Sequence, residues 1–176
     1  KEDKGFIMIE LFHYPHYTLE RVSTEWDWKT DAIDHHPDLE KFEHEMIKCM
    51  EDEGGLGLAA NQIGITKRFF AIGHDSFDTI RNPAIIYNPR ILKSSTEKVI
   101  DVEGCLSFMG VWVKVERPKI VEVQYELSNG QTHTHAIDGM ESKCFQHELD
   151  HLDGITFNKR VSKLKWDMAK KKSQRN

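Results

Sequence analysis

Residues 147–151 read His-Glu-Leu-Asp-His, and this pentapeptide constrains the chain more than any other segment. Two histidines four residues apart lie on one face of a helix, so both imidazole rings can reach a single metal ion. Glu148, beside the first histidine, can take a proton from a water molecule bound to that ion. The pattern therefore predicts a helix that carries the metal site of a hydrolase.

The flanking residues also predict a helix, from about residue 139 to residue 153. Asp138 can cap its N-terminus, and Glu141, three residues on, completes a capping-box pattern. Gly154 stands where a helix-ending glycine is expected. We expect one face of this helix to point inward, because its residues recur at three- and four-residue steps: Met140, Cys144, His147 and His151. The simpler alternative is a core helix with two hydrogen-bonded histidines.

Two histidines leave the ligand set incomplete, because a catalytic zinc-type site usually has three protein ligands and one water. Residues 152–176 contain no Glu, His or Cys, and the two aspartates there are poorly placed. The third ligand should therefore come from upstream. Cys144 lies on the same helix, roughly 10 Å of helix rise from His151, so one ion would reach both only with strain. Cys105 has no such limit, because it comes from another element.

Three segments of the chain together resemble the motifs of peptide deformylases. They are Gly55-Leu-Gly-Leu-Ala-Ala-Asn-Gln62, Glu103-Gly-Cys-Leu-Ser107 and Gln146-His-Glu-Leu-Asp-His151, and their order and spacing also fit. The likeness extends from about Tyr14 to about Gly154. Members of this family remove the N-formyl group from the initiator methionine of new polypeptides and release formate. The fold that the resemblance implies is an α+β domain.

The resemblance implies a metal centre held by Cys105, His147 and His151, with water in the fourth position. Glu148 would be the general acid and base. Family membership suggests Fe²⁺ as the ion, with Zn²⁺ or Ni²⁺ as substitutes, although a Cys/His ligand set is also a good zinc site. The substrates and partners would be N-formylmethionyl peptides of nascent chains.

The resemblance also implies an oxyanion hole formed by Gln62 and the backbone N–H of Leu106. Neither donor needs to titrate, which suits the stabilisation of a developing oxyanion. Glu103 would pair with Arg117. The strand-like groove for the substrate backbone would be lined by three residues, Leu56, Gly57 and Gly104.

The chain departs from the family pattern in three places. The second motif is followed by Phe108-Met-Gly110, where the family commonly has one residue and then proline. Lys143 and its polar neighbours stand where the family is usually apolar, so Lys143 could alter the mouth of the methionine pocket. The C-terminal helix is reduced to a stub near residues 161–172. We therefore expect the chemistry to follow the family more closely than the substrate preference does.

Composition places the chain among ordinary globular proteins, and its 176 residues predict one catalytic domain, residues 1–176. The net charge of −5 shows no basic excess that would indicate a specific nucleic-acid partner.

No apolar run approaches the roughly 18 residues of a membrane span. Residues 1–4, Lys-Glu-Asp-Lys, lack the apolar stretch of a signal peptide. Three cysteines, an odd number, favour a reducing compartment. We expect a cytoplasmic protein of a bacterial cell, with a phage gene or an organelle as alternatives.

Periodicity predicts a central motif helix packed against small antiparallel sheets. A second helix is expected over about residues 37–53, with Cys49 as a small buried apolar residue. Strand-like runs cover residues 67–73, 84–87, 97–102, 111–116, 121–127 and 131–137. Asn129-Gly130 predicts a two-residue hairpin turn. That turn would place His133 opposite Glu126 and His135 opposite Gln124, on a polar face that disfavours a second metal site.

Two other functions remain open from the sequence. A metallopeptidase would cleave internal peptide bonds and would use a third ligand other than Cys105. A non-catalytic metal-bound module would bind nascent chains without turnover, but such a module needs neither Glu148 nor Gln62. The basic residues near the C-terminus, Lys170-Lys-Lys172 and Arg175, are most simply a solvated end; a weak contact with the ribosome is the alternative.

Overall fold

The computed structural model describes residues 9–34, 36 and 38–174, and every structural statement below concerns these residues. The first four residues, on which the signal-peptide expectation rests, lie outside them, as do Pro37 and Arg175. Within the described residues, no helix has both the length and the apolar character needed to span a membrane.

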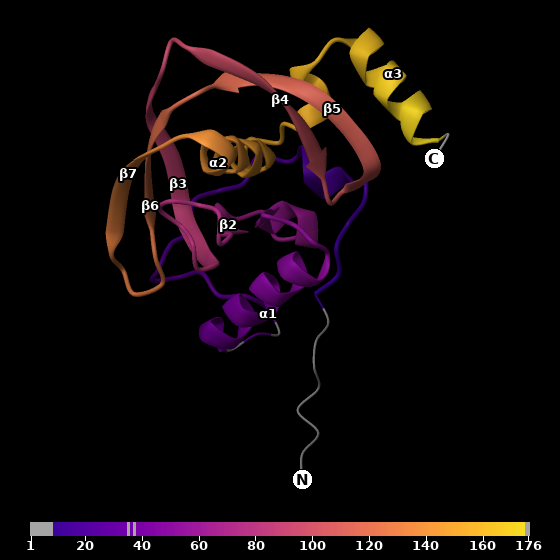
Figure 1. Cartoon of the computed structure of the whole chain (residues 1–176). Helices are drawn as coiled ribbons and strands as arrows, with labels where there is room; N and C mark the ends of the chain where they lie inside the picture. The colour runs from indigo at the N-terminus through magenta and orange to yellow at the C-terminus, as the bar shows by residue number, and fades with distance from the viewer. Residues whose placement is uncertain (1–8, 35, 37, 175–176) are drawn as a thin grey trace.

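Five antiparallel strands form the main sheet (Figure 1). Their order is β1 (Gly57–Ala59), β2 (Phe69–Ile72), β3 (Ala84–Ser94), β6 (Val121–Glu126) and β7 (Thr132–Ile137). All four residues of strand β2 are buried. Because successive side chains of a strand point to opposite sides, β2 is covered on both faces. Phe70 and Ile72 belong to one apolar cluster, whereas Phe69 and Ala71 belong to another. The sheet is therefore covered on both sides.

Two helices provide that cover. Helix α1 (Leu39–Asp52) begins at Asp38, whose side chain accepts the N–H of Lys41, and it packs Phe42, Met46 and Met50 into the second cluster. Helix α2 (Gly139–Leu152) packs Phe145, Leu149 and Leu152 into the first cluster. The prediction of a motif helix against antiparallel sheets is confirmed, and the motif helix is the buried one.

The remaining strands, β4 (Lys98–Cys105) and β5 (Phe108–Pro118), form a separate two-stranded sheet. In Figure 1 this sheet arches over α2. The C-terminal helix α3 (Lys163–Ser173) packs its Trp166 against Phe108 of β5. Three short 3-10 helices complete the chain: η1 (Tyr17–Glu20), η2 (Ala60–Ile63) and η3 (Phe157–Arg160). The motif helix is thus enclosed between the main sheet and the β4–β5 sheet.

The β6–β7 hairpin differs from the prediction by one residue. Leu127 N–H donates to Gln131 O at 2.9 Å, which leaves a loop of three residues, 128–130, instead of two. A shift of one residue moves every side chain of a strand to the other face. His133 therefore lies opposite Tyr125, and His135 lies opposite Val123. The two histidines are stacked near the Tyr125 ring and do not lie on a polar face.

Strand β3 is longer than the predicted run of residues 84–87. Pro89 lacks an N–H to donate to a neighbouring strand, and such a residue is uncommon inside a sheet. The register of β3 against β6 shifts between Tyr87 and Arg90. Pro89 lies within this irregularity, where the regular pairing of N–H groups is interrupted and its missing N–H is tolerated. Asn88, at the same place, has a positive φ of 49°.

The ends of α2 are set partly by residues far away in the sequence. Gly154, with φ of 69°, ends the helix as predicted. The capping box was wrong, because Asp138 makes no side-chain cap bond. The carboxylate of Glu141 instead accepts the backbone N–H groups of Thr79 and Ile80, at 3.2 and 2.7 Å. Met140 is 47% exposed, so it does not share the burial of Cys144, His147 and His151, which were predicted to lie on the same inward face.

Candidate active site and metal centre

Three potential metal ligands from two distant elements lie together. Cys105 ends β4, and His147 and His151 lie one turn apart on α2. Their ligand atoms all lie within 4.8 Å of one another, and no other such group of three occurs among the described residues. The Cys105 sulfur lies 3.3 Å from His151 Nε2. Cys144, the other upstream candidate, is not part of this group.

Glu103 fixes the orientation of the first histidine. Burial alone would raise the pKa of this carboxyl, but hydrogen bonds from His147 and Arg117 outweigh burial and lower the pKa to about 2. Glu103 is therefore a carboxylate that can only accept. His147 Nδ1 donates to it at 2.9 Å, which leaves Nε2 as the metal-binding nitrogen. This arrangement is typical of metal-ligating histidines.

Arg117 connects the β4–β5 sheet to the motif helix. Its guanidinium donates to Glu103 at 2.5 and 3.0 Å, as expected, and also to Asp150 of α2 at 2.9 Å. Asp150 in turn accepts from Arg160. Because Arg117 is buried, its two ion pairs are shielded from solvent. The network holds the strand that carries Cys105 against the helix that carries the histidines.

Replacement of Arg117 by methionine should lower the free energy of unfolding by about 3–5 kcal/mol, because it leaves the buried carboxylate of Glu103 without its guanidinium and removes one of the two cations paired with Asp150. Urea denaturation of the metal-free protein measures this change. The matched control is Lys119→Met, whose ion pair with Glu97 is exposed and should contribute nothing measurable. An Arg117→Met variant as stable as the starting protein would contradict this account.

The ligand set fits a transition-metal ion of borderline softness. One thiolate and two imidazoles are ligands that zinc and iron accept, and carboxylate-binding ions such as Mg²⁺ do not favour them. Burial lowers the pKa of His151 well below its usual range, so this imidazole is neutral, as metal binding requires. Cys105 is partly exposed, so the group is reachable from solvent.

Glu148 lies beside the ligand set, and the pKa of its carboxyl is higher than usual. Burial raises the pKa of this carboxyl to about 7. Among the described residues, its Oε2 atom has no hydrogen-bond partner. A Cβ atom at Gly57 would come within 2.6 Å of the Glu148 side chain, so any larger residue there would displace this carboxyl. Glu148 can thus hold or release a proton near neutral pH.

The amide of Gln62 is held so that its N–H groups point to the site. Its oxygen accepts the backbone N–H of Ala59 at 2.8 Å. Its nitrogen donates to Ser107 Oγ at 3.1 Å and lies 3.7 Å from the Cys105 sulfur. The orientation of the amide follows from these partners, because the oxygen already has its donor.

Two features of this site were missed in the sequence. Ser107 Oγ accepts from Gln62 and donates to the backbone oxygen of Phe12 at 2.7 Å, so it links the N-terminal segment to the site. Asp150 joins the Arg117 network. Both residues lie inside the conspicuous motifs, and that position was the only signal. Their roles depend on contacts between residues 33 to 95 positions apart.

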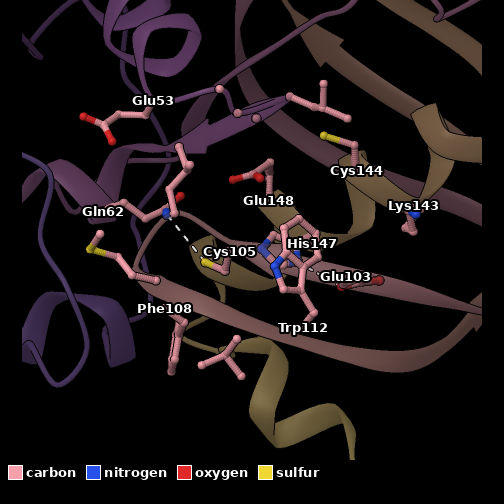
Figure 2. A pocket seen from close by; sticks show the side chains of 18 of the residues that line it. Glu53, Gln62, Glu103, Cys105, Phe108, Trp112, Lys143, Cys144, His147 and Glu148 are labelled. Atoms are coloured by element: carbon pink, nitrogen blue, oxygen red, sulfur yellow. Dashed lines mark hydrogen bonds and ion pairs between the residues drawn. The ribbon is translucent and has the colours of Figure 1, made fainter. Parts of the chain in front are cut away.

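A cavity of about 490 Å³ connects these groups (Figure 2). It is lined by every predicted site residue except His151: Leu56, Gly57, Gln62, Gly104, Cys105, Leu106, His147 and Glu148. His151 Nε2 lies 3.3 Å from the Cys105 sulfur. The structure therefore brings the predicted residues together from η2, β1, β4 and α2.

Comparison with known proteins agrees with this geometry. The sequence model of the polypeptide deformylase family matches residues 8–167. A peptide deformylase from Rhizobium meliloti (strain 1021) is 35% identical over 159 residues, which are 90% of this chain and 88% of that protein. One from Wolbachia pipientis wMel is 38% identical over 165 residues, 89% of this chain and 90% of that protein.

The chain belongs to the polypeptide deformylase family. It is a metal-dependent enzyme that removes the N-formyl group from nascent polypeptides. Among solved structures, the fold is similar to a peptide deformylase from Synechococcus elongatus in complex with actinonin. The TM-score is 0.82 at 33% identity, covering 94% of this chain and 88% of that one. The predicted α+β deformylase fold is confirmed.

Proposed function

We propose that the 490 Å³ cavity is the site of deformylation and that the chain acts as a single catalytic domain. Cys105, His147 and His151 hold the metal ion. The observation that carries this proposal is the position of Glu148, a carboxyl with a pKa of about 7, beside three converging ligand atoms. When bound, the ion would supply a nucleophile at neutral pH by lowering the pKa of water and would polarise the formyl oxygen.

Glu148 moves the proton in this proposal. As a carboxylate it accepts a proton from the attacking water, and as a carboxylic acid it returns that proton to the nitrogen of the expelled amine. A pKa near neutrality makes both directions accessible. The free Oε2 atom is available for this exchange.

Gln62 and the backbone N–H of Leu106 stabilise the negative charge that develops on the formyl oxygen. Gln62 is preorganised for this, because Ala59 and Ser107 already fix its amide. The substrate backbone lies along Leu56, Gly57 and Gly104, which all line the cavity. Glycine at two of these positions permits a close approach of the peptide.

Replacement of Gln62 by leucine should lower kcat for formate release by about 10²–10³, the usual effect of removing one oxyanion donor. The metal content should not change, because Gln62 is not a ligand. Steady-state kinetics on formyl-Met-Ala-Ser, together with elemental analysis, measures both quantities. A loss of metal in proportion to the loss of activity would show that Gln62 instead supports the ligand Cys105.

For the identity of the ion, we propose Fe²⁺, with Zn²⁺ or Ni²⁺ as substitutes. A Cys/His ligand set accepts all three ions. Elemental analysis of protein prepared without oxygen, combined with formate release by protein reloaded with each ion, tests this proposal. Metal-loaded protein that releases no formate from formyl-Met-Ala-Ser would overturn the proposed function.

A weak contact with the ribosome is a further part of the proposal. Helix α3 exposes Lys170, Lys171 and Lys172 in its last turn. Such a group of cations binds phosphates with an affinity that falls with salt. Co-sedimentation with ribosomes at low and high salt tests this contact.

A further inference from the structure

One wall of the active-site cavity is the face of α2 that precedes the ligand His147. Cys144 and Lys143 lie three and four residues before His147, which places them about one helical turn of 5.4 Å away. Both line the cavity. In Figure 2 they lie on one side of Glu148, and Gln62 and Glu53 lie on the other. The cavity thus extends from the reacting groups toward Lys143.

The lining of the cavity includes several apolar side chains. Leu56, Met140, Cys144 and Trp112 are among them. The Trp112 indole lies against Gly104, where a Cβ atom would come within 2.7 Å of the ring. An unbranched side chain that starts beside Glu148 and runs one helical turn along α2 would contact these residues. Its far end would then reach Lys143.

Lys143 brings a hydrogen-bond donor to that apolar space. Its side chain is only 20% exposed, so most of the alkyl stem is buried. The ammonium donates to Asp101 Oδ2 at 2.7 Å and to the backbone oxygen of Val102 at 3.2 Å. A lysine ammonium has three N–H groups, so these two partners within the described residues leave one donor for a ligand or water.

We propose that Lys143 is a specificity-determining residue, through which the enzyme accepts a first residue whose side chain carries a neutral hydrogen-bond acceptor near its end. Methionine sulfoxide is such a side chain, because its oxygen is bonded to the sulfur, one atom before the terminal methyl group. The inference rests on the proposed function of the cavity. Apolar walls bind the stem, and the remaining N–H of Lys143 binds the sulfoxide oxygen. Because Asp101 balances the lysine charge, a neutral acceptor is favoured over a carboxylate.

The test compares formate release from three peptides that differ only at the first residue: formyl-methionine sulfoxide-Ala-Ser, formyl-norleucine-Ala-Ser and formyl-Met-Ala-Ser. Norleucine has a similar length but no acceptor. We expect the starting enzyme to cleave the sulfoxide peptide with a kcat/KM close to that of the norleucine peptide. Both sulfoxide epimers are assayed, because the sulfoxide is chiral.

The deciding variant is Lys143→Met, which keeps an unbranched stem and removes the donor. It should lower the ratio of kcat/KM for sulfoxide to that for norleucine by at least about tenfold, the size expected for a hydrogen bond to a charged group. Asp101→Asn keeps the Lys143 donor and should leave the ratio close to that of the starting enzyme. Lys119→Met, with its exposed pair, is the control for loss of a lysine elsewhere.

Three results would overturn the inference. The Lys143→Met variant could keep both its activity and its ratio of kcat/KM for the two peptides. It could also lose activity on all three peptides equally, which would make Lys143 a structural support. The starting enzyme could also reject the sulfoxide peptide while it cleaves the norleucine peptide. If no formate is released even from formyl-Met-Ala-Ser, the proposed function itself fails, and the inference fails with it.

Discussion

Replacement of Glu148 by alanine is expected to lower kcat for formate release by about 10²–10⁴, the range for loss of a general acid and base. Glu148 lies beside the ligand set but is not part of it. Its buried carboxyl has a pKa of about 7, so it can exchange a proton at neutral pH. Formate release under saturating formyl-Met-Ala-Ser measures the effect.

The matched variant is Glu148→Gln, which keeps the shape that fits against Gly57 and cannot accept the proton. We expect it to be as inactive as the alanine variant and to contain the same amount of metal. If both variants kept full activity, the proton would have to move through another group. A protein in which Glu148→Ala changed only the metal content would favour a non-catalytic metal-bound module.

Replacement of Cys105 by alanine should remove both the metal and the activity. Changes to groups that only orient a ligand commonly cost about 10–100-fold in metal affinity, so loss of a ligand should cost more than about 100-fold. The remaining imidazoles, His147 and His151, would be too few for a stable catalytic site. Elemental analysis after dialysis, followed by kinetics with added Fe²⁺ or Zn²⁺, measures the effect.

The control for this experiment is Cys144→Ala, because Cys144 was the other upstream candidate and also lines the cavity. It should retain the metal. Activity that survived in Cys105→Ala would mean that the third ligand lies elsewhere, as in the metallopeptidase alternative. Loss of metal in Cys144→Ala would show that the ligand group is not the one formed by Cys105 and the two histidines.

The position of Cys105 beside His147 and His151 could be predicted from the sequence, because few residue types can complete a metal site that already has two histidines. The i and i+4 spacing determines where two ligands lie on a helix, and helix geometry disfavours Cys144. That reasoning needs only local structure and coordination chemistry. The α+β fold was also accessible, because the long strands alternate and the motif helix carries a clear face.

Other features depended on contacts that local patterns do not encode. Glu141 follows a capping pattern, yet two N–H groups of a distant loop compete for its carboxylate and bind it. The β6–β7 register depended on whether the loop has two or three residues, and the three-residue loop reverses the faces of His133 and His135. The bond from Ser107 to Phe12 joins segments 95 residues apart.

The ion pairs of Arg117 have a consequence for how the enzyme can be loaded with metal. They fasten the β4–β5 sheet to α2 through protein groups alone, from Glu103 on the strand to Asp150 on the helix. These ion pairs therefore help to hold Cys105 close to the two histidines, although Arg117 contacts none of the three ligands. A variant without Arg117 should bind the metal ion less tightly as well as unfold more easily.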